Sequence, residues 1–204
     1  MSKAVMLSIR PKWCEKIASG EKTIEVRKTR PKLKTPFKCY IYCTVEMAGY
    51  DALWVLDVPT REKYSFMAVA AYLENPKGAN KGNGKVIGEF TCDRIYKIDK
   101  DSTDFLFKAG ELSVYKQAAE EKCGLCVAMT DDELHGYLGH CQGYGWHIAN
   151  LKIYDKPKEL SEFSRPFENC TGKVCDEFGC AFCENGGHIK RPPQSWCYVE
   201  KMEG

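Results

Sequence analysis

The chain has 204 residues, 44% of them hydrophobic and 28% charged, so it can bury a core and is not disordered by composition. The net charge of +2 hides an asymmetry, because residues 1–38 carry eleven Lys and Arg against three Glu, a balance of +8, whereas the rest of the chain is mildly acidic. This distribution predicts a local anion-binding surface and argues against a basic coat over the whole protein.

The first residues, MSKAVMLSIRPKW, lack the long apolar run of a signal peptide. No stretch approaches the roughly 18 apolar residues that a membrane span needs. We therefore expect a cytosolic protein whose twelve cysteines are buried thiols or metal ligands rather than disulfides.

The N-terminal elements begin with a buried strand at Ala4–Ile9. A short helix follows, because Pro11 suits the first helical position and Gly20 can end the helix. Trp13, Cys14 and Ile17 are expected to face inward at helical spacing.

The next segment, GEKTIEVRK, has the alternation of a strand. Ile24 and Val26 are expected to face the core. Thr23, Glu25 and Arg27 are expected to form a polar row on the other face, with Lys22 at the mouth of the strand. Polar rows on strands are often ordinary wet faces, whose ion pairs contribute little. In the functional alternative, the row is the floor of a site that binds a charged ligand.

The later elements are mostly strands. Residues 39–43 predict a strand, 85–98 one long strand with a bulge or bend at Gly88, and 145–154 another strand. Thr130 is an N-cap for a helix. Within the ambiguous stretch 46–74, residues 52–58 could form a strand and residues 66–74 either a helix or a strand. Residues 192–199 can close the fold by pairing back near the first strand. Many strands and few helices predict a mainly β, α+β single domain over 1–204, built as a small closed or half-closed barrel.

Gly20, Lys22, Glu25 and Arg27 spell Gly-x-Lys-x-x-Glu-x-Arg, the hallmark of ASCH domains, and the flanking segments also resemble that family. ASCH domains are relatives of the PUA RNA-binding domains, and the late segments resemble a subgroup found in bacterial prophages. The resemblance implies a PUA-like barrel with flanking short helices, a cleft beside the motif strand, and RNA or a nucleotide as ligand.

Some ASCH proteins are amidohydrolases that deacylate an N4-acetylated cytidine. In those proteins the motif lysine is catalytic and a threonine occupies the position of Glu25. Lys22 and Glu25 are therefore the catalytic candidates if this chain is an enzyme, either an amidohydrolase or a ribonuclease.

The run from Arg27 to Lys38 is either a solvated loop or a contact for a nucleic-acid backbone. Trp13, Tyr40 and Tyr42 could stack on bases or belong to the core. The residues that we select as ligand contacts are Lys12, Lys22, Glu25, Arg27, Lys28, Arg30, Trp146 and Gln194.

A cysteine-rich insertion at about 168–189 contains C-x4-C-x4-C-x2-C. Four thiols within fourteen residues of little apolar content predict a structural zinc site, although a reduced, metal-free loop is the alternative. His188 could replace one ligand, and Cys123 and Cys126 could contribute a second pair. The predicted ligands are Cys170, Cys175, Cys180 and Cys183.

The sequence favours a binding module for RNA or a nucleotide at the motif. The alternatives are an amidohydrolase or ribonuclease at the same cleft, and a protein that binds a peptide or metabolite there.

Overall fold

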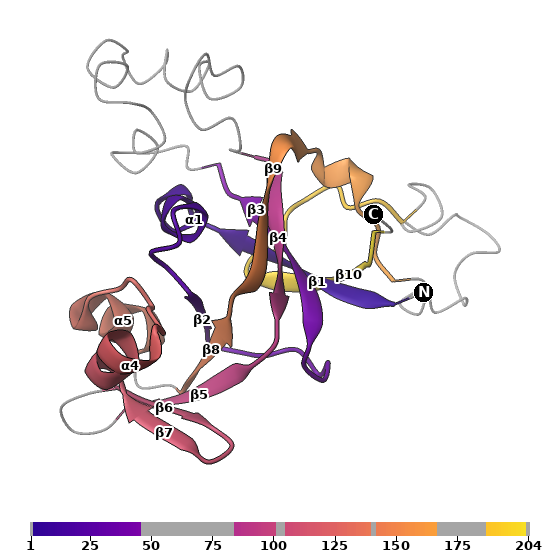
Figure 1. The fold of residues 1–204 in the computed structure, drawn as a ribbon. Helices are drawn as coiled ribbons and strands as arrows, with labels where there is room; N and C mark the ends of the chain where they lie inside the picture. Colours follow the sequence, from indigo (N-terminus) through magenta and orange to yellow (C-terminus); the bar gives the residue numbers. More distant parts are fainter. Residues whose placement is uncertain (1, 46–83, 101–104, 140–141, 167–186, 203–204) are drawn as a thin grey trace, which may run out of the picture. The chain divides into compact units, whose positions relative to one another are not determined.

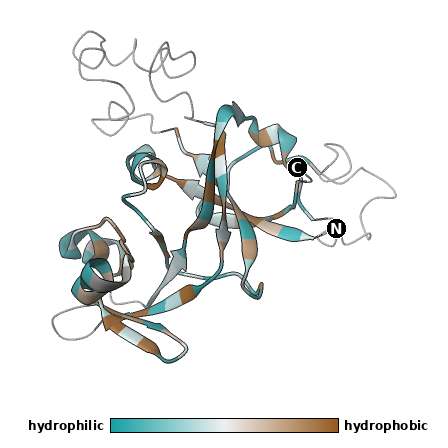
Figure 2. Ribbon diagram, viewed as in Figure 1, coloured by the Kyte–Doolittle hydropathy of each residue, from teal (hydrophilic) through white to brown (hydrophobic). Residues whose placement is uncertain are grey.

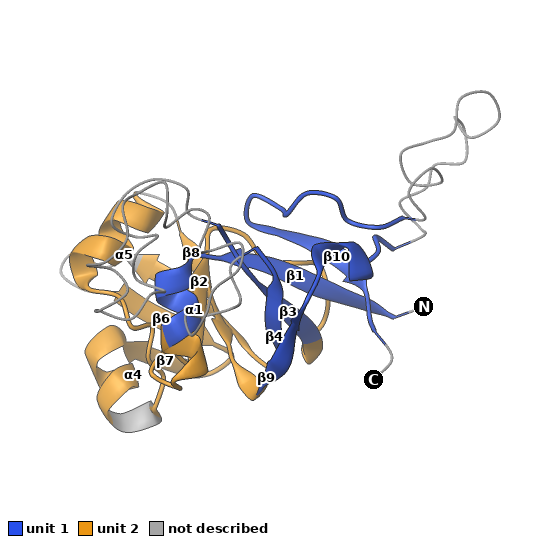
Figure 3. Cartoon of the chain, turned by 90° about the horizontal axis from the view of Figure 1, so that it is seen from above, with its two compact units in different colours: residues 1–15, 38–89, 152–204 blue, residues 16–37, 90–151 orange. Residues whose placement is uncertain are grey.

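The structure is a computed structural model that describes residues 2–45, 84–100, 105–139, 142–166 and 187–202. Its contacts divide the chain into two compact units, of residues 1–15, 38–89 and 152–204 (unit 1) and residues 16–37 and 90–151 (unit 2) (Figure 3). The stretch 46–74, predicted as strand and as helix or strand, and the cysteine-rich loop at 170–183 lie outside the described residues. No helix among the described residues is long and apolar enough to cross a membrane.

The strands form two five-stranded sheets (Figure 1). The first sheet has the order β10-β1-β3-β4-β9. Its strands are β1 (Lys3–Ile9), β3 (Phe37–Cys43), β4 (Val86–Cys92), β9 (Ala149–Lys158) and β10 (Trp196–Glu200).

The second sheet has the order β2-β8-β5-β6-β7. Its strands are β2 (Ile24–Arg27), β5 (Ile95–Lys100), β6 (Phe105–Ala109), β7 (Leu112–Tyr115) and β8 (Gly143–His147). Among the described residues, the helical elements are α1 (Pro11–Ala18), α4 (Lys116–Cys123), α5 (Asp131–Leu138) and η2 (Leu160–Glu162).

The pairing of the last strand with the first agrees with the sequence prediction. β1 pairs with β3 in parallel and with β10 antiparallel, so the last strand does return to the first. The described strands nevertheless pair into two separate sheets, and of the closed or half-closed barrel that we expected, the closed form is not found. The supported class is α+β, with two sheets and few helices.

Two predicted long strands are each broken into two. Residues 85–98 form β4 and β5, with Asp93 and Arg94 between them, and residues 145–154 divide at Ile148 into β8 and β9. The physical reason is that the two halves of each broken strand belong to different sheets: β4 and β9 to the first, β5 and β8 to the second. The chain must therefore leave the hydrogen-bonded ladder of one sheet before it joins that of the other. Gly88 lies inside β4, where a Cβ atom would come within 2.5 Å of the Lys152 carbonyl oxygen, so it permits a close backbone approach rather than a break.

Unit 1 has its own core. Tyr40 and Tyr42 are buried in it, so they do not offer faces for base stacking, and the Tyr40 ring packs edge-on against Phe163 with centroids 4.9 Å apart. The other buried members of this core are Ala4, Met6, Val86, Ile189 and Val199.

Unit 2 packs one face of the second sheet against its helices. Figure 2 shows hydrophobic and hydrophilic residues alternating along the β6–β7 hairpin, as a half-buried sheet requires. Helix α5 begins where the sequence predicted, because the Thr130 side chain accepts from the Glu133 amide and the Glu133 side chain accepts from the Thr130 amide. The buried core of this unit includes Ile24, Val26, Tyr96, Ile98, Phe107, Ala119, Leu134 and Leu138.

Candidate nucleic-acid interface

The polar row of the motif strand is buried. Lys22, Glu25 and Arg27 are only 2%, 5% and 6% exposed, so this row is not an ordinary wet face. Glu25 and Arg27 share one face of β2 and stand opposite Trp146 and Tyr144 of β8. Their neighbours Ile24 and Val26 point to the core, as the alternation predicted.

Glu25 connects the two motif cations. Its carboxylate oxygens lie 2.9 Å from Nη2 of Arg27 and 3.6 Å from Nζ of Lys22. The Lys22 ammonium also donates a hydrogen bond of 2.6 Å to the carbonyl oxygen of Val127. Burial lowers the pKa of Lys22 below its ordinary 10.5, and the nearby Glu25 carboxylate opposes that shift. Desolvation therefore disfavours the charged form of Lys22.

The segment from Gly124 to Ala128 holds the start of the motif strand. The Thr23 hydroxyl donates to the Gly124 carbonyl oxygen at 3.0 Å and accepts from the Cys126 amide at 2.8 Å. The Thr23 amide in turn donates to the Cys126 carbonyl oxygen at 2.9 Å. These contacts join residues about a hundred positions apart, and they could not be predicted from the sequence because no local pattern marks such a pairing. The Thr23 hydroxyl is therefore engaged with the backbone of residues 124 and 126.

Two tyrosines that were not predicted from the sequence lie beside the basic residues Lys28 and Arg30, which follow the motif strand. The Lys28 ammonium is 5.5 Å from the ring centroid of Tyr137 on α5, and the Arg30 guanidinium carbon is 5.9 Å from that of Tyr144 on β8. Tyr137 is half-buried, and burial raises the pKa of its hydroxyl. Only the tertiary fold places these rings next to the motif, since they are more than a hundred residues away in sequence.

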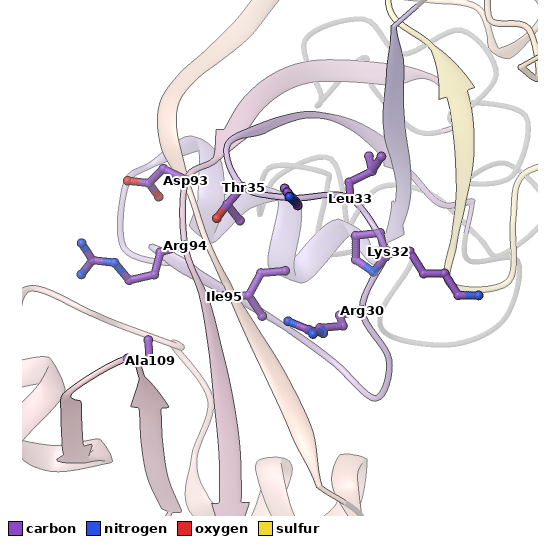
Figure 4. A pocket seen from close by; sticks show the side chains of 11 residues that line it. Arg30, Lys32, Leu33, Thr35, Asp93, Arg94, Ile95 and Ala109 are labelled. Carbon is purple, nitrogen blue, oxygen red and sulfur yellow. The ribbon is translucent and has the colours of Figure 1, made fainter.

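A basic cavity of about 600 Å³ follows the motif strand (Figure 4). Three segments of unit 2 line it: the loop 30–35, the start of β5 with the two residues before it, and the β6–β7 turn. Four cations and a single acid contribute to the lining, and all five side chains are exposed. These charged residues are Arg30, Lys32, Lys34 and Arg94, with Asp93 as the acid.

The remaining predicted contacts are placed as follows. Trp146 is fully buried, directly opposite Glu25, and its ring packs edge-on to Phe37 at 5.8 Å, so its face is not open to a ligand. Lys12 and Gln194 belong to unit 1, where the Lys12 ammonium lies 4.6 Å from the centroid of the half-buried Trp13 ring and Gln194 is exposed just before β10.

His147 forms a hydrogen bond within unit 2. Its Nδ1 lies 2.6 Å from a carboxylate oxygen of Asp93, an acid that also lines the cavity.

The described residues do not test the predicted zinc site. No group of three or more potential metal ligands gathers in the part of the chain that the structure describes, and the four predicted ligands lie outside that part. His188 is exposed, with its Nδ1 3.4 Å from the Ser164 hydroxyl. Of the second predicted pair, Cys126 is half-buried and Cys123 ends α4.

Comparison with known proteins supports the fold alone. No family model matches the sequence, and no curated protein matches it. The crystal structure of a point mutant of the ASCH protein from Zymomonas mobilis, ZmASCH, aligns with a TM-score of 0.50 at 14% identity, over 98% of this chain and 92% of that one. The chain has an ASCH-type fold. The unmutated ZmASCH structure aligns with a TM-score of 0.49 at 15% identity, over 97% and 88% of the two chains.

Proposed function

We propose that this chain is an RNA- or nucleotide-binding domain of the ASCH/PUA-like type. Its sequence resembles the subgroup of this family that is found in bacterial prophages. Its phosphate contacts come from the loop that follows the Gly-x-Lys-x-x-Glu-x-Arg motif. The observation that carries the proposal is the basic cavity, whose lining contains four cations and one acid. A cavity of about 600 Å³ falls within the range of roughly 300–1,000 Å³ that small-molecule and nucleotide-sized ligands occupy.

The buried motif residues fix the strand from which the cavity-lining loop begins. Arg27 ends β2 three residues before Arg30, so the conformation of the strand sets where the basic loop begins. Glu25 neutralises positive charge beneath the loop and holds Lys22 and Arg27 in place. In this arrangement the motif is the framework of the site, and the exposed cations of the loop make the first contacts with phosphate.

The test compares two double variants in binding to a fluorescently labelled single-stranded RNA, measured by anisotropy over a series of salt concentrations. Lys32→Ala/Lys34→Ala removes two lining cations, and Lys156→Ala/Lys201→Ala removes two exposed lysines of unit 1 as a control. If each lining lysine neutralises one phosphate, the slope of log affinity against log salt falls by about 1.4, and affinity at about 0.1 M salt falls roughly 25-fold.

The control is expected to change neither quantity. Absence of binding by the wild type at low salt, or equal losses in both double variants, contradicts the proposal. In the first case a small metabolite or peptide becomes the better candidate ligand.

A second candidate function is supported by the lowered pKa of Lys22. A buried lysine whose pKa is lowered, 3.6 Å from a carboxylate, has the features of a base or nucleophile, as an amidohydrolase acting on an N4-acylated cytidine-type nucleoside would need. Lys22→Arg separates the two functions, because a guanidinium stays protonated at any working pH. Hydrolysis of N4-acetylcytidine by the wild type that is lost in both Lys22→Arg and Lys22→Ala supports the enzyme. Absence of turnover by the wild type removes it.

A further inference from the structure

The second sheet carries a row of basic side chains with one aromatic ring among them. Across the strands, Arg27 pairs with Tyr144, Tyr144 with Lys97, and Lys97 with Lys108. Residues that are directly opposite in antiparallel strands share a face. Ile24, Val26, Tyr96 and Ile98, which alternate with members of this row, point into the core of unit 2. The row therefore lies on the polar face of the sheet, away from that core.

The exposed part of this row can meet a ligand. The Lys97 and Lys108 side chains are 45% and 46% exposed, although each forms an ion pair with Asp99, at 3.0 and 3.2 Å. Exposed ion pairs of this kind are weak, so a phosphate can compete for either ammonium group. Tyr144, between Arg27 and Lys97, is half-buried. The row thus combines cations with a partly accessible aromatic ring, the composition of single-stranded nucleic-acid sites.

Arg30 connects this ring to the basic cavity. The same guanidinium lines the cavity and lies 5.9 Å from the centroid of the Tyr144 ring. Stacked groups approach to about 3.5–4.0 Å, so Arg30 is beside the ring without being in full face contact with it. A phosphate held in the cavity would draw the Arg30 guanidinium toward itself. The Tyr144 ring would then be open to stack with the base of the same or the next nucleotide.

We propose that Tyr144 is a base-stacking platform and that the ligand of this face is single-stranded RNA, with one phosphate at Arg30 and a base on the Tyr144 ring. This inference rests on the proposed function and adds to it the class of nucleic acid. Bases in a duplex have their faces covered by their neighbours, so a stacking platform selects unpaired bases. A protein that made only salt-dependent contacts with phosphates would bind single strands, duplexes and other polyanions without such a preference.

The experiment uses the full chain and three probes of equal length: a single-stranded oligouridylate, the same backbone without bases, and a duplex RNA. Tyr144→Ala is expected to weaken binding of the oligouridylate roughly five- to 150-fold, the range for loss of one stacked base, with an unchanged salt slope. Its affinity for the abasic backbone is expected to stay the same. Tyr144→Phe, which keeps the ring, should retain wild-type affinity and also shows that the position tolerates substitution.

The outcomes separate this inference from the proposed function. If Tyr144→Ala weakens the oligouridylate and the abasic backbone equally, or weakens neither, the stacking platform is overturned while phosphate binding by the cavity stands. A wild type that prefers the duplex also overturns it. If Lys32→Ala/Lys34→Ala leaves binding of every probe unchanged, the proposed function itself fails. Tyr144→Ala protein that is not folded by circular dichroism is replaced by Tyr144→Leu in the same comparison.

Discussion

Replacing Glu25 with glutamine tests the ion network beneath the basic loop. The substitution keeps the shape of the side chain and leaves the buried Lys22 and Arg27 without their shared counter-charge. The side chains of Lys22, Glu25 and Arg27 are only 1%, 7% and 7% exposed, so the cost is that of breaking a buried pair, about 3–5 kcal/mol, rather than the 0–1 kcal/mol of a surface pair. That loss is a large share of a typical total of about 5–15 kcal/mol and corresponds to a fall in Tm of roughly 6–20 °C.

The loss in Glu25→Gln should also depend on pH. Without the carboxylate, burial acts on Lys22 with less opposition, and its folded-state pKa falls further below the ordinary 10.5. Between those two values the unfolded chain holds a proton that the folded chain has released, so the free energy of unfolding rises with pH. We therefore expect the deficit of the variant to be larger at pH 6 than at pH 9.

Urea unfolding, followed by circular dichroism at both pH values, measures this deficit. Lys85→Gln is the matched control, because it breaks an exposed pair with Glu159, whose side chains are 38% and 58% exposed, and should cost less than about 1 kcal/mol. If Glu25→Gln costs no more than Lys85→Gln, the motif is solvated in solution, and the argument that it forms a buried framework is wrong.

Three further predictions concern other parts of the chain. Thr130→Ala should destabilise the protein by about 1 kcal/mol through loss of the α5 cap, with faster amide exchange in the first turn, and wild-type exchange there would contradict the assigned cap. Burial raises the pKa of the Cys92 thiol from 9.0 to about 12, so its contribution to stability is present below pH 9 and lost as the pH rises toward 12. Cys92→Ala should therefore lose less stability than the wild type over that interval, and equal losses would show that Cys92 is not the source. Protein purified without added metal should contain about one zinc per chain by elemental analysis, and an intact fold with all twelve thiols free would contradict a site at Cys170, Cys175, Cys180 and Cys183.

Local signals in the sequence determined several elements correctly. Proline can begin a helix and glycine can end one, and α1 does start at Pro11, with Gly20 at a φ of +81° just beyond its end. The cap of α5 could be read from Thr130 because a capping box depends on residues three positions apart. The alternation in β2 likewise predicted that Ile24 and Val26 would point into the core.

Only the tertiary structure decided that the polar residues of the motif are buried and paired with one another. Alternation placed Glu25 and Arg27 on one face of β2, but it could not tell whether water or protein covers that face. The answer depends on the carbonyl oxygen of Val127, which accepts from Lys22, and on Tyr144, which stands opposite Arg27. The cavity likewise combines the loop 30–35 with residues 93–95 and 109–110. Such contacts join segments distant in sequence, and because burial and charge compensation arise only when those segments pack together, the pattern of one strand cannot specify them.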